Sequence, residues 1–387
     1  MAEQEIYFDN SATTQVESSV AEAVYRVMVE DYGNPSSLHQ KGMAAERLLK
    51  EARRQVAKSI GAKEQEIYFT SGGTESDNLA ILGLAQAYKN KGKHIITTAI
   101  EHPAVLQPVR MLQEQGYAVD LLPVDVRGCV RLEDVAACLR PDTLLVSVMM
   151  VNNEVGSIQP IAEIGHLLRQ QKQRVYFHVD AVQAYGKLPL SPKTWGVDLL
   201  SASGHKIQAP KGVGFLYVAE GVRLLPILGG GGQENNLRSG TENLPGIVGL
   251  AAASKLATAG MEQHRQQVEA VRSAFLAGLQ QLSGWQVNGD LAAALPYVLN
   301  LRFDGVKSEV LLHMLETRGL FVSAGSACSA KKKENLSPVL QAMGLPKQAI
   351  EGSLRFSFSA QNTVAEAEKA AAILCQEVES LRKILRG

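Results

Sequence analysis

Three short segments place polar side chains and glycines directly after predicted strands. The first, residues 70–75, reads TSGGTE. Its two glycines let the backbone approach a ligand, and Thr74 offers a hydroxyl at a predicted helix N-terminus, where free N–H groups favour an anion. An ordinary helix-capping turn uses the same residue types. This segment alone therefore leaves phosphate binding and simple capping both open.

The other two segments, HVDAVQ from His178 and SGHK ending at Lys206, each carry a charged residue. Asp180 follows an apolar strand, where an unpaired carboxylate is costly; it either caps a helix or pairs with a buried cation such as a protonated ring nitrogen. Gln183 can offer its amide to a phenolic oxygen. Lys206, beside Ser203 and His205, is either an exposed loop lysine or one that forms a Schiff base with a carbonyl cofactor. Together and in this order, the three segments favour a pyridoxal phosphate site.

Four cysteines lie far apart in the chain and form no CxxC pair, which argues against a disulfide framework or a zinc site. Cys129 and Cys138 lie at the short helical pattern LEDVAACL, and Cys375 lies in an apolar terminal helix, so we predict packing roles for these three. Cys328 lies among small residues in SAGSACSA, where no core helix or strand is evident. It needs a different explanation.

The elements that position these residues alternate between strand and helix from about residue 66. Each short β-rich run, such as EIYFT, HIITTAI, TLLVSVMMV, RVYFHVDA and DLLSAS, is followed by a helical pattern or a loop. This alternation predicts an α/β fold with a mostly parallel sheet covered on both faces. In such sheets ligands bind beyond the carboxyl ends of the strands.

After GGGGQENNLRSGTENLPG the pattern changes. We expect one long helix over residues 247–282, strands at PYVLNLRF, LFVSAG and GSLRFSFS, a helix at SEVLLHMLETRG, and a final helix over residues 364–385. This predicts a second, smaller α+β domain. We place the large domain at residues 16–254 and the small domain at residues 1–15 and 255–387, with the first forty residues wrapping across both.

The composition narrows the class of protein. The 387 residues carry 39 basic and 39 acidic side chains, so no basic excess favours nucleic acid as a partner. No apolar run reaches membrane-spanning length, and the N-terminus lacks the pattern of a signal peptide. We therefore expect a soluble cytoplasmic protein.

The motifs as a set resemble those of the cysteine desulfurases of the NifS/IscS type, which belong to the class-V aminotransferase group of fold-type-I pyridoxal phosphate enzymes. The resemblance covers nearly the whole chain and rests on eleven segments in family order: YFDNSATT, YGNPSSLH, FTSGGTESDN, EHPAV, VNNEVG, HVDAVQ, SGHK, PKGVGFLY, RSGTEN, GSACS and LRFSFS. It implies a seven-stranded, mostly parallel sheet plus a smaller domain. It also implies conversion of L-cysteine to L-alanine, with the sulfur passing to a cysteine of the enzyme as a persulfide.

The resemblance implies a role for each catalytic position. Lys206 holds the cofactor as a Schiff base and is released to act as a base; His102 stacks on the cofactor ring and helps to move protons. Cys328 is the nucleophile that takes the sulfur atom, for which it must be a thiolate. Arg355 clamps the substrate carboxylate with its two-donor fork, and Asn153 contacts both the substrate and the ring-oxygen side of the cofactor.

The cofactor contacts implied by the resemblance are more numerous. Asp180 pairs with the pyridinium nitrogen, and Gln183 contacts the ring oxygen. The phosphate is held by Gly73, Thr74, Ser203 and His205. Thr241 is expected to reach the phosphate of the other subunit, which implies a homodimer. The protein that finally accepts the sulfur, an iron–sulfur scaffold or a thiolation enzyme, is not named by the sequence.

Residues 325–338 resemble the long, mobile cysteine loop of one branch of the family. Within them, Lys331–Lys333 form either a solvated basic run or a charge that favours the thiolate or steers an acidic acceptor. A selenocysteine lyase, a small aminotransferase and a non-catalytic protein of the same fold remain as rivals. An aminotransferase needs no cysteine nucleophile, and the joint presence of Lys206, Asp180, His102 and Cys328 argues against a non-catalytic protein.

Overall fold

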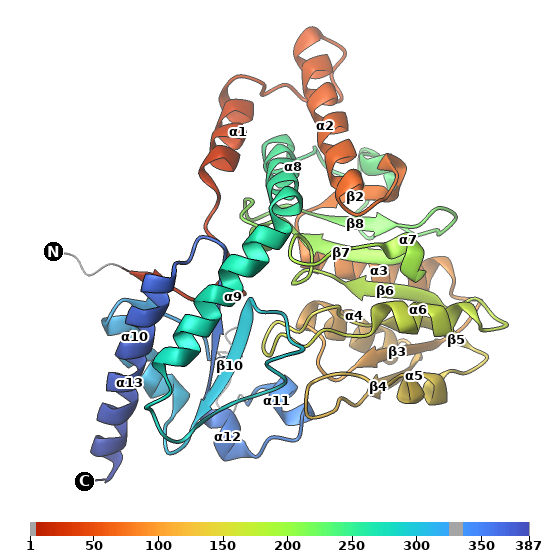
Figure 1. Cartoon of the computed structure of the whole chain (residues 1–387). Coiled ribbons are helices and arrows are strands. Elements are labelled where there is room, and N and C mark those ends of the chain that lie inside the picture. The colour runs from red at the N-terminus through yellow and green to blue at the C-terminus, as the bar shows by residue number, and fades with distance from the viewer. Residues whose placement is uncertain (1–4, 325–335, 387) are drawn as a thin grey trace.

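A mixed seven-stranded sheet lies at the centre of the larger part of the chain (Figure 1). The computed structural model describes residues 5–324 and 336–386. The strand order is β2-β8-β7-β6-β5-β3-β4; β8 runs antiparallel to both its neighbours and the remaining pairs are parallel. The strands are β2 (Ile67–Thr70), β3 (His94–Thr98), β4 (Ala118–Leu122), β5 (Thr143–Ser147), β6 (Tyr176–Asp180), β7 (Leu199–Ser203) and β8 (Gly214–Val218). The predicted α/β class and the seven strands are confirmed.

The strands form because their apolar residues can be buried on both faces of the sheet. Side chains alternate along a strand, and in β8 Phe215 and Tyr217 belong to one apolar cluster while Leu216 and Val218 belong to the other. The second cluster is closed by α3 (Gly73–Ala87) and α4 (Pro103–Glu114). The opposite face packs against further helices in the first cluster. These include α2 (Gln40–Ser59), α6 (Ile161–Arg169) and α8 (Leu244–Ala259), with α1 (Ser18–Val29), α5 (Leu132–Cys138) and α7 (Pro192–Trp195) beside them.

The expected long helix over residues 247–282 is wrong in one respect, because the structure has two helices there. α8 ends at Ala259, and α9 (Met261–Gly278) leaves Gly260 at an angle of 74°. A Cβ at residue 260 would lie 2.6 Å from the His264 ring, so a larger residue at the bend would require that side chain to move. Among the described residues no single helix is long and apolar enough to cross a membrane; α8 and α9 pass that test only when joined across their bend.

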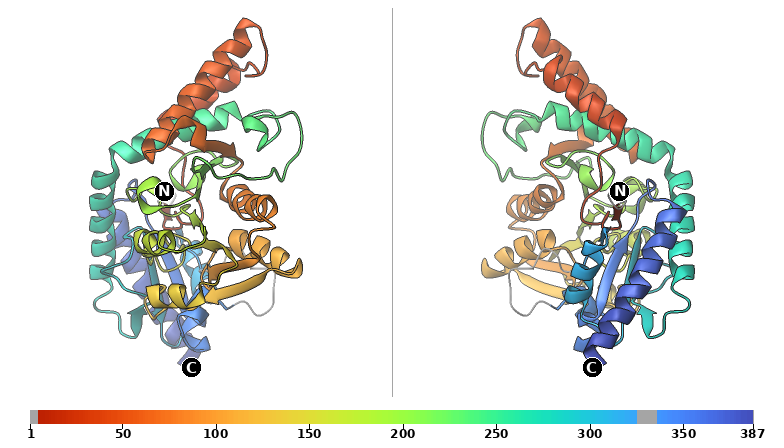
Figure 2. Two further views of the ribbon diagram at one scale, coloured as in Figure 1. Left: turned by 90° about the vertical axis from the view of Figure 1, so that its right-hand side faces the viewer. Right: turned by 90° about the vertical axis from the view of Figure 1, so that its left-hand side faces the viewer.

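The C-terminal part contains a three-stranded antiparallel sheet, β12-β10-β9, covered by α9 and α13 (Figures 1 and 2). Its strands are β9 (Trp285–Val287), β10 (Val298–Phe303) and β12 (Ser353–Ser357). The helices are α10 (Ser308–Thr317), α11 (Pro338–Ala342), α12 (Lys347–Glu351) and α13 (Val364–Arg386). The final helix, β10 and β12 lie where the sequence predicts them. Cys138 and Cys375 pack against the main core, as expected.

The N-terminal segment joins the two parts of the chain. β1 (Ile6–Tyr7) pairs in parallel with β11 (Leu320–Phe321), and Asp9 forms a bridge with Ser357 of β12. A few residues later the Thr14 N–H and hydroxyl both donate to the His205 carbonyl oxygen, each at 2.9 Å. The start of the chain thus runs from the small sheet to the loop after β7, as predicted. The proposed domain boundaries stay a prediction.

Candidate active site

The carboxyl ends of three strands meet at one edge of the large sheet. Asp180 is the last residue of β6, and Ser203 is the last residue of β7, its neighbour. Thr70 ends β2, and both Thr70 and Ser203 pair with Gly214, the first residue of β8. Because β8 lies between them and is antiparallel to both, β2 and β7 end at the same edge of the sheet. The three segments identified in the sequence therefore converge here.

The turn after β2 depends on glycine for space and for backbone conformation. Gly72 has φ +145°, and a Cβ at Gly214 would lie 2.7 Å from the Gly72 Cα atom. A Cβ at Gly73 would lie 2.6 Å from Val182 Cγ2. The helix α3 begins at Gly73, so its N-terminus lies beside Ser203, and Thr74 is the second residue of this helix. This is the geometry of an anion site at a helix N-terminus.

Lys206 lies three residues beyond β7, at the end of a short 3₁₀ turn (Gly204–Lys206). Its Nζ donates to the carbonyl oxygens of Ser11 (2.5 Å) and Ala12 (2.7 Å). The neighbouring His205 contacts Thr13 through Nδ1 (3.3 Å). Burial, followed by the charge of Lys206, lowers the pKa of His205 to about 4, so this ring is neutral at pH 7.

Asp180 is a buried carboxylate at the end of β6. Its Oδ1 accepts the Val182 N–H at 2.9 Å. Burial, followed by the charge of Asp77, raises the pKa of Asp180 to about 7. A protonated ring nitrogen beside it would favour the ionised carboxylate.

A polar layer crosses the sheet beneath Asp180. His178, fully buried in β6, contacts Ser147 Oγ through Nδ1 (2.8 Å) and Ser201 Oγ through Nε2 (3.0 Å). Its Nε2 also lies 3.4 Å from Asp77 Oδ1. Burial lowers the pKa of His178 to about 4 and raises that of Asp77 to about 7. The layer therefore supplies no fixed positive charge to Asp180.

His102 caps α4, with Nδ1 accepting the Ala104 N–H at 3.1 Å. This bond leaves the proton of the neutral ring on Nε2. Burial is the main influence on the pKa of His102 and lowers it, while Asp180 raises it and Lys206 lowers it. His102 is therefore electrostatically coupled to both charged residues of the site.

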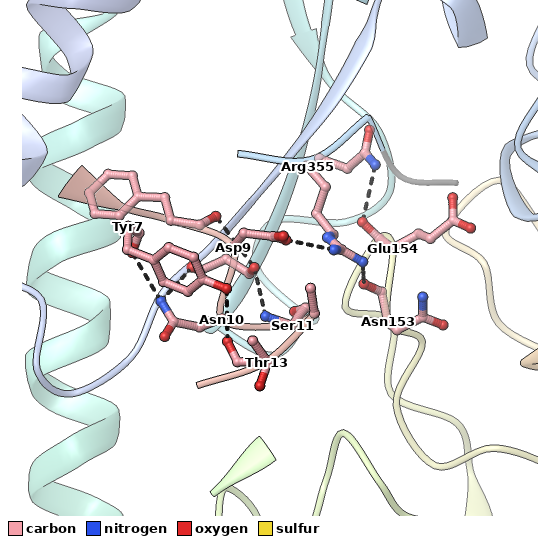
Figure 3. Close-up of polar contacts among 12 residues, drawn as sticks. Tyr7, Asp9, Asn10, Ser11, Thr13, Asn153, Glu154 and Arg355 are labelled. Atoms are coloured by element: carbon pink, nitrogen blue, oxygen red, sulfur yellow. Dashed lines mark hydrogen bonds and ion pairs between the residues drawn. The ribbon is translucent and has the colours of Figure 1, made fainter. Parts of the chain in front are cut away.

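Arg355 lies in the middle of β12, where its guanidinium reaches toward the N-terminal segment and the turn after β5 (Figure 3). Nη2 donates to Asp9 Oδ1 at 2.8 Å and Nη1 donates to the main-chain oxygen of Asn153 at 3.0 Å. Asn153 thus meets Arg355 through its backbone, and its side chain is not part of this contact. The next residue, Glu154, has its pKa raised to about 7 by burial.

The remaining predicted residues are not among the described contacts of this site. Thr241 is exposed in the segment before α8 and takes no part in the contacts described above. Cys328 and Lys331–Lys333 lie outside the described residues. On either side of that gap, Ser323 pairs with Arg355 and Ser337 Oγ donates to Glu154 at 2.5 Å. The chain therefore leaves and re-enters the described structure beside the Arg355 site.

The sequence reasoning missed several residues that the fold brings to this edge: Asp9, Ser11, Asp77, His178 and Lys187. Asp9 and Ser11 belong to YFDNSATT, which was expected to run across both domains but was given no role in the site. Lys187 is the only charged residue in AVQAYGKLPL, and a lysine inside an apolar stretch is a signal that was available.

The site has the three kinds of group that bind pyridoxal phosphate: an anion-binding turn, a carboxylate and a lysine amine. The glycine turn at α3 suits a phosphate, the buried Asp180 suits a ring cation, and Lys206 lies in the turn that follows the neighbouring strand β7. The amide of Gln183 lies close to Lys206, since its Nε2 donates to the same Ser11 oxygen at 3.0 Å. The residues present therefore fit such a group.

Comparison with known proteins agrees with this geometry. The family model "Aminotransferase class-V" matches residues 6–369, and this family uses pyridoxal phosphate. A protein named cysteine desulfurase IscS from Methanosarcina thermophila is 44% identical over 98% of this chain and 93% of its own length.

Two solved structures are similar over most of the chain. One is titled "NIFS-LIKE PROTEIN" and superposes with a TM-score of 0.92 at 38% identity, covering 98% of this chain and 100% of the other. The other, titled "SspA in complex with cysteine", has a TM-score of 0.81 at 33% identity and covers 92% and 99%. The chain therefore belongs to the class-V aminotransferase family and, within it, to the cysteine desulfurases of the IscS and NifS type.

Proposed function

We propose that this protein converts L-cysteine to L-alanine with pyridoxal phosphate, and that Cys328 takes the sulfur atom as a persulfide. The observation that carries the proposal is the convergence of Lys206, Asp180, His102 and Arg355 around the carboxyl edge of the large sheet. Similarity to cysteine desulfurases, one of them at 44% identity, supports the same substrate.

The cofactor would be held at both ends. Gly73, Thr74, Ser203 and His205 would hold its phosphate, and the carboxylate of Asp180 would pair with its ring nitrogen. Gln183 and Asn153 would lie on its ring-oxygen side, His102 would stack on its ring, and Lys206 would bind it covalently. When bound, the cofactor supplies an electron sink for negative charge at the α-carbon of the amino acid.

The side chains supply binding and proton transfer. Arg355 binds the substrate carboxylate. Its guanidinium is already fixed by Asp9 and Asn153, so it loses little conformational entropy when substrate binds. Lys206 moves the proton of the α-carbon. His102, neutral because burial lowers its pKa, can accept and return a proton at its ring.

Cys328 would complete the reaction. Its thiolate forms a bond to the substrate sulfur while the substrate carbon–sulfur bond breaks and the carbon keeps the electron pair and takes a proton. One cysteine and one enzyme thiol thus become one alanine and one enzyme persulfide. Residues Ser323 and Ser337, on either side of the segment, lie at Arg355 and Glu154. Cys328 follows Ala324 by four residues, a reach of up to about 14 Å.

We also propose a homodimer. Large apolar side chains are exposed on α1 and on the chain that leads into α2, with Leu38 exposed to 96% and Tyr32 to 68%. This part of the chain projects from the body of the molecule (Figures 1 and 2). Exposed apolar patches of this kind are typical of protein interfaces. Thr241, exposed in one subunit, would then reach the phosphate in the other.

The destination of the sulfur is a second protein, either an iron–sulfur scaffold or a thiolation enzyme.

Cys129, Cys138 and Cys375 form no disulfide among the described residues, which suits the reducing cytoplasm. Burial raises the pKa of all three thiols, so each is a weaker nucleophile than an activated cysteine.

The test is a comparison of wild type with Lys206→Ala and Cys328→Ser. We expect purified wild type to carry a visible absorption band that Lys206→Ala lacks, and to release equal amounts of alanine and sulfide from cysteine when a thiol reductant is present. Cys328→Ser should keep the band and lose sulfide release. Full sulfide release by Cys328→Ser would exclude the proposed nucleophile, and amino transfer to a keto acid at a comparable rate would favour an aminotransferase.

A further inference from the structure

Lys187 is a buried lysine that the reaction above does not use. It lies in the turn that follows β6, four residues after Gln183, and only 7% of its surface is exposed. Burial of a lysine is costly unless the amine finds partners. The contacts of this amine therefore show what offsets that cost.

The amine has partners on two sides. Its Nζ donates to Gln183 Oε1 at 3.3 Å and lies 5.4 Å from the centre of the Tyr297 ring. Lys187 and Lys206 both line one small cavity of about 40 Å³ that Tyr297 also lines. Burial, followed by the charges of Lys206 and Arg355, lowers the pKa of Lys187 to about 7.

The contact with Lys187 determines which way the Gln183 amide faces. A glutamine amide has one end that accepts and one that donates, and a protonated lysine amine can serve it only as a donor. The amide oxygen therefore faces Lys187. Its NH₂ group faces the Ser11 carbonyl oxygen at 3.0 Å, and the same oxygen accepts Lys206 Nζ. Lys187, Gln183, Ser11 and Lys206 form one continuous hydrogen-bonded chain.

We propose that Lys187 is a positioning residue that holds the Gln183 amide with its N–H donors toward the Lys206 side of the site. A reversed amide would present an oxygen there, which would repel the ring oxygen of the cofactor instead of donating to it. The protonated amine performs this role, because a neutral amine could also accept a hydrogen bond and would not fix the direction of the amide. The inference rests on the proposed role of Lys206 in cofactor binding.

The experiment measures cofactor affinity and the visible spectrum of the bound cofactor in a double-mutant cycle. The variants are Lys187→Met, Gln183→Ala and the double variant, with Lys187→Arg as the conservative replacement and Lys193→Met, an exposed lysine, as control. We expect Lys187→Met to bind pyridoxal phosphate about tenfold more weakly, the size expected for loss of a hydrogen bond to a charged donor. Its visible band should shift in the same direction as that of Gln183→Ala.

In the double variant the loss should be no larger than in Gln183→Ala alone, and Lys187→Arg should recover part of the affinity. Equal and independent losses from the two single variants, or a wild-type spectrum in Lys187→Met, would overturn the inference. If Lys187→Met gives little folded protein, Lys187→Ala provides the same comparison. Lys206→Ala is measured in parallel: if it binds the cofactor with the wild-type spectrum, the proposed function itself fails, whatever the Lys187 variants show.

Discussion

Arg355 and Asp9 are ion-paired across 346 residues of chain, with Nη2 and Oδ1 2.8 Å apart. The guanidinium is 4% exposed, and its other end donates to the Asn153 carbonyl oxygen. Its Nε has no hydrogen-bond partner among the described residues. The arginine is thus held from two sides and keeps one donor without a partner among the described residues. The first residues of the chain are therefore part of the site and not only a connecting strand.

Asp9→Asn should weaken substrate binding without loss of the cofactor. Removing the charge from the Asp9–Arg355 pair should raise KM for cysteine about tenfold, as expected for loss of a charged hydrogen bond. Steady-state kinetics and the visible spectrum provide the two measurements. Asp304→Asn, at an exposed aspartate, is the control. An unchanged KM in Asp9→Asn would show that Arg355 does not need this partner.

Gly73→Ala should reduce cofactor affinity through the phosphate turn. The added Cβ would lie 2.6 Å from Val182 Cγ2, so the turn has to shift. Overpacking of this kind costs about 1–3 kcal/mol, and a cost of that size in the bound state corresponds to a rise of about 5-fold to 150-fold in Kd for pyridoxal phosphate. Gly229→Ala, where the Cβ would meet no atom within 4 Å, should leave Kd unchanged. Equal affinities for both variants would contradict the phosphate site.

The activity should depend on neutral His102 at the acid end of the pH range. Burial lowers the pKa of His102, so the ring protonates only when the pH falls below the usual histidine value of about 6.5. We therefore expect kcat/KM to stay level from neutral pH down to that value and to fall below it. His102→Asn should be slower by about 100-fold or more and should lack this acid limb. If kcat/KM of His102→Asn still falls at acid pH, the titrating group is not His102.

Arg53→Met should destabilise the fold because it leaves a buried charge behind. Glu234, 2% exposed, accepts Nη1 and Nη2 of Arg53 at 2.8 and 2.6 Å. Breaking a buried pair costs about 3 kcal/mol or more in the free energy of unfolding. Arg54→Met, which removes exposed pairs with Glu51 and Glu64, should cost less than about 1 kcal/mol. Urea unfolding of the cofactor-free protein measures the free energy of unfolding of both variants. A similar decrease in Arg53→Met and Arg54→Met would contradict this prediction.

The sequence was sufficient to predict the sheet and the residues at its carboxyl edge. Apolar runs of strand length identified β5, β6 and β7, and parallel strands bring their carboxyl ends together, so Asp180 and Lys206 could be expected near each other. The two glycines at the start of α3, Gly72 and Gly73, likewise indicated a close approach of the backbone. These features are local in sequence and follow from side-chain period and turn geometry.

Other parts of the site depend on contacts between distant segments. Nothing near Asp9 in the sequence specifies its pairing with Arg355. Lys187 and Gln183 are close in sequence, but their role follows only from the position of Ser11. The bend at Gly260 was missed because an isolated glycine is tolerated within many helices. The role of Cys328 rests on the family resemblance and stays a prediction.

The central claim is tested most directly by the mass of the protein after one turnover. Wild type is mixed with one equivalent of cysteine without reductant, and the peptide that contains Cys328 is examined by mass spectrometry. We predict that it gains one sulfur atom, removable by a thiol, with one alanine released, and that neither occurs in Lys206→Ala. Alanine formation without added sulfur on Cys328, or sulfur found on Cys129, Cys138 or Cys375 instead, would contradict the account.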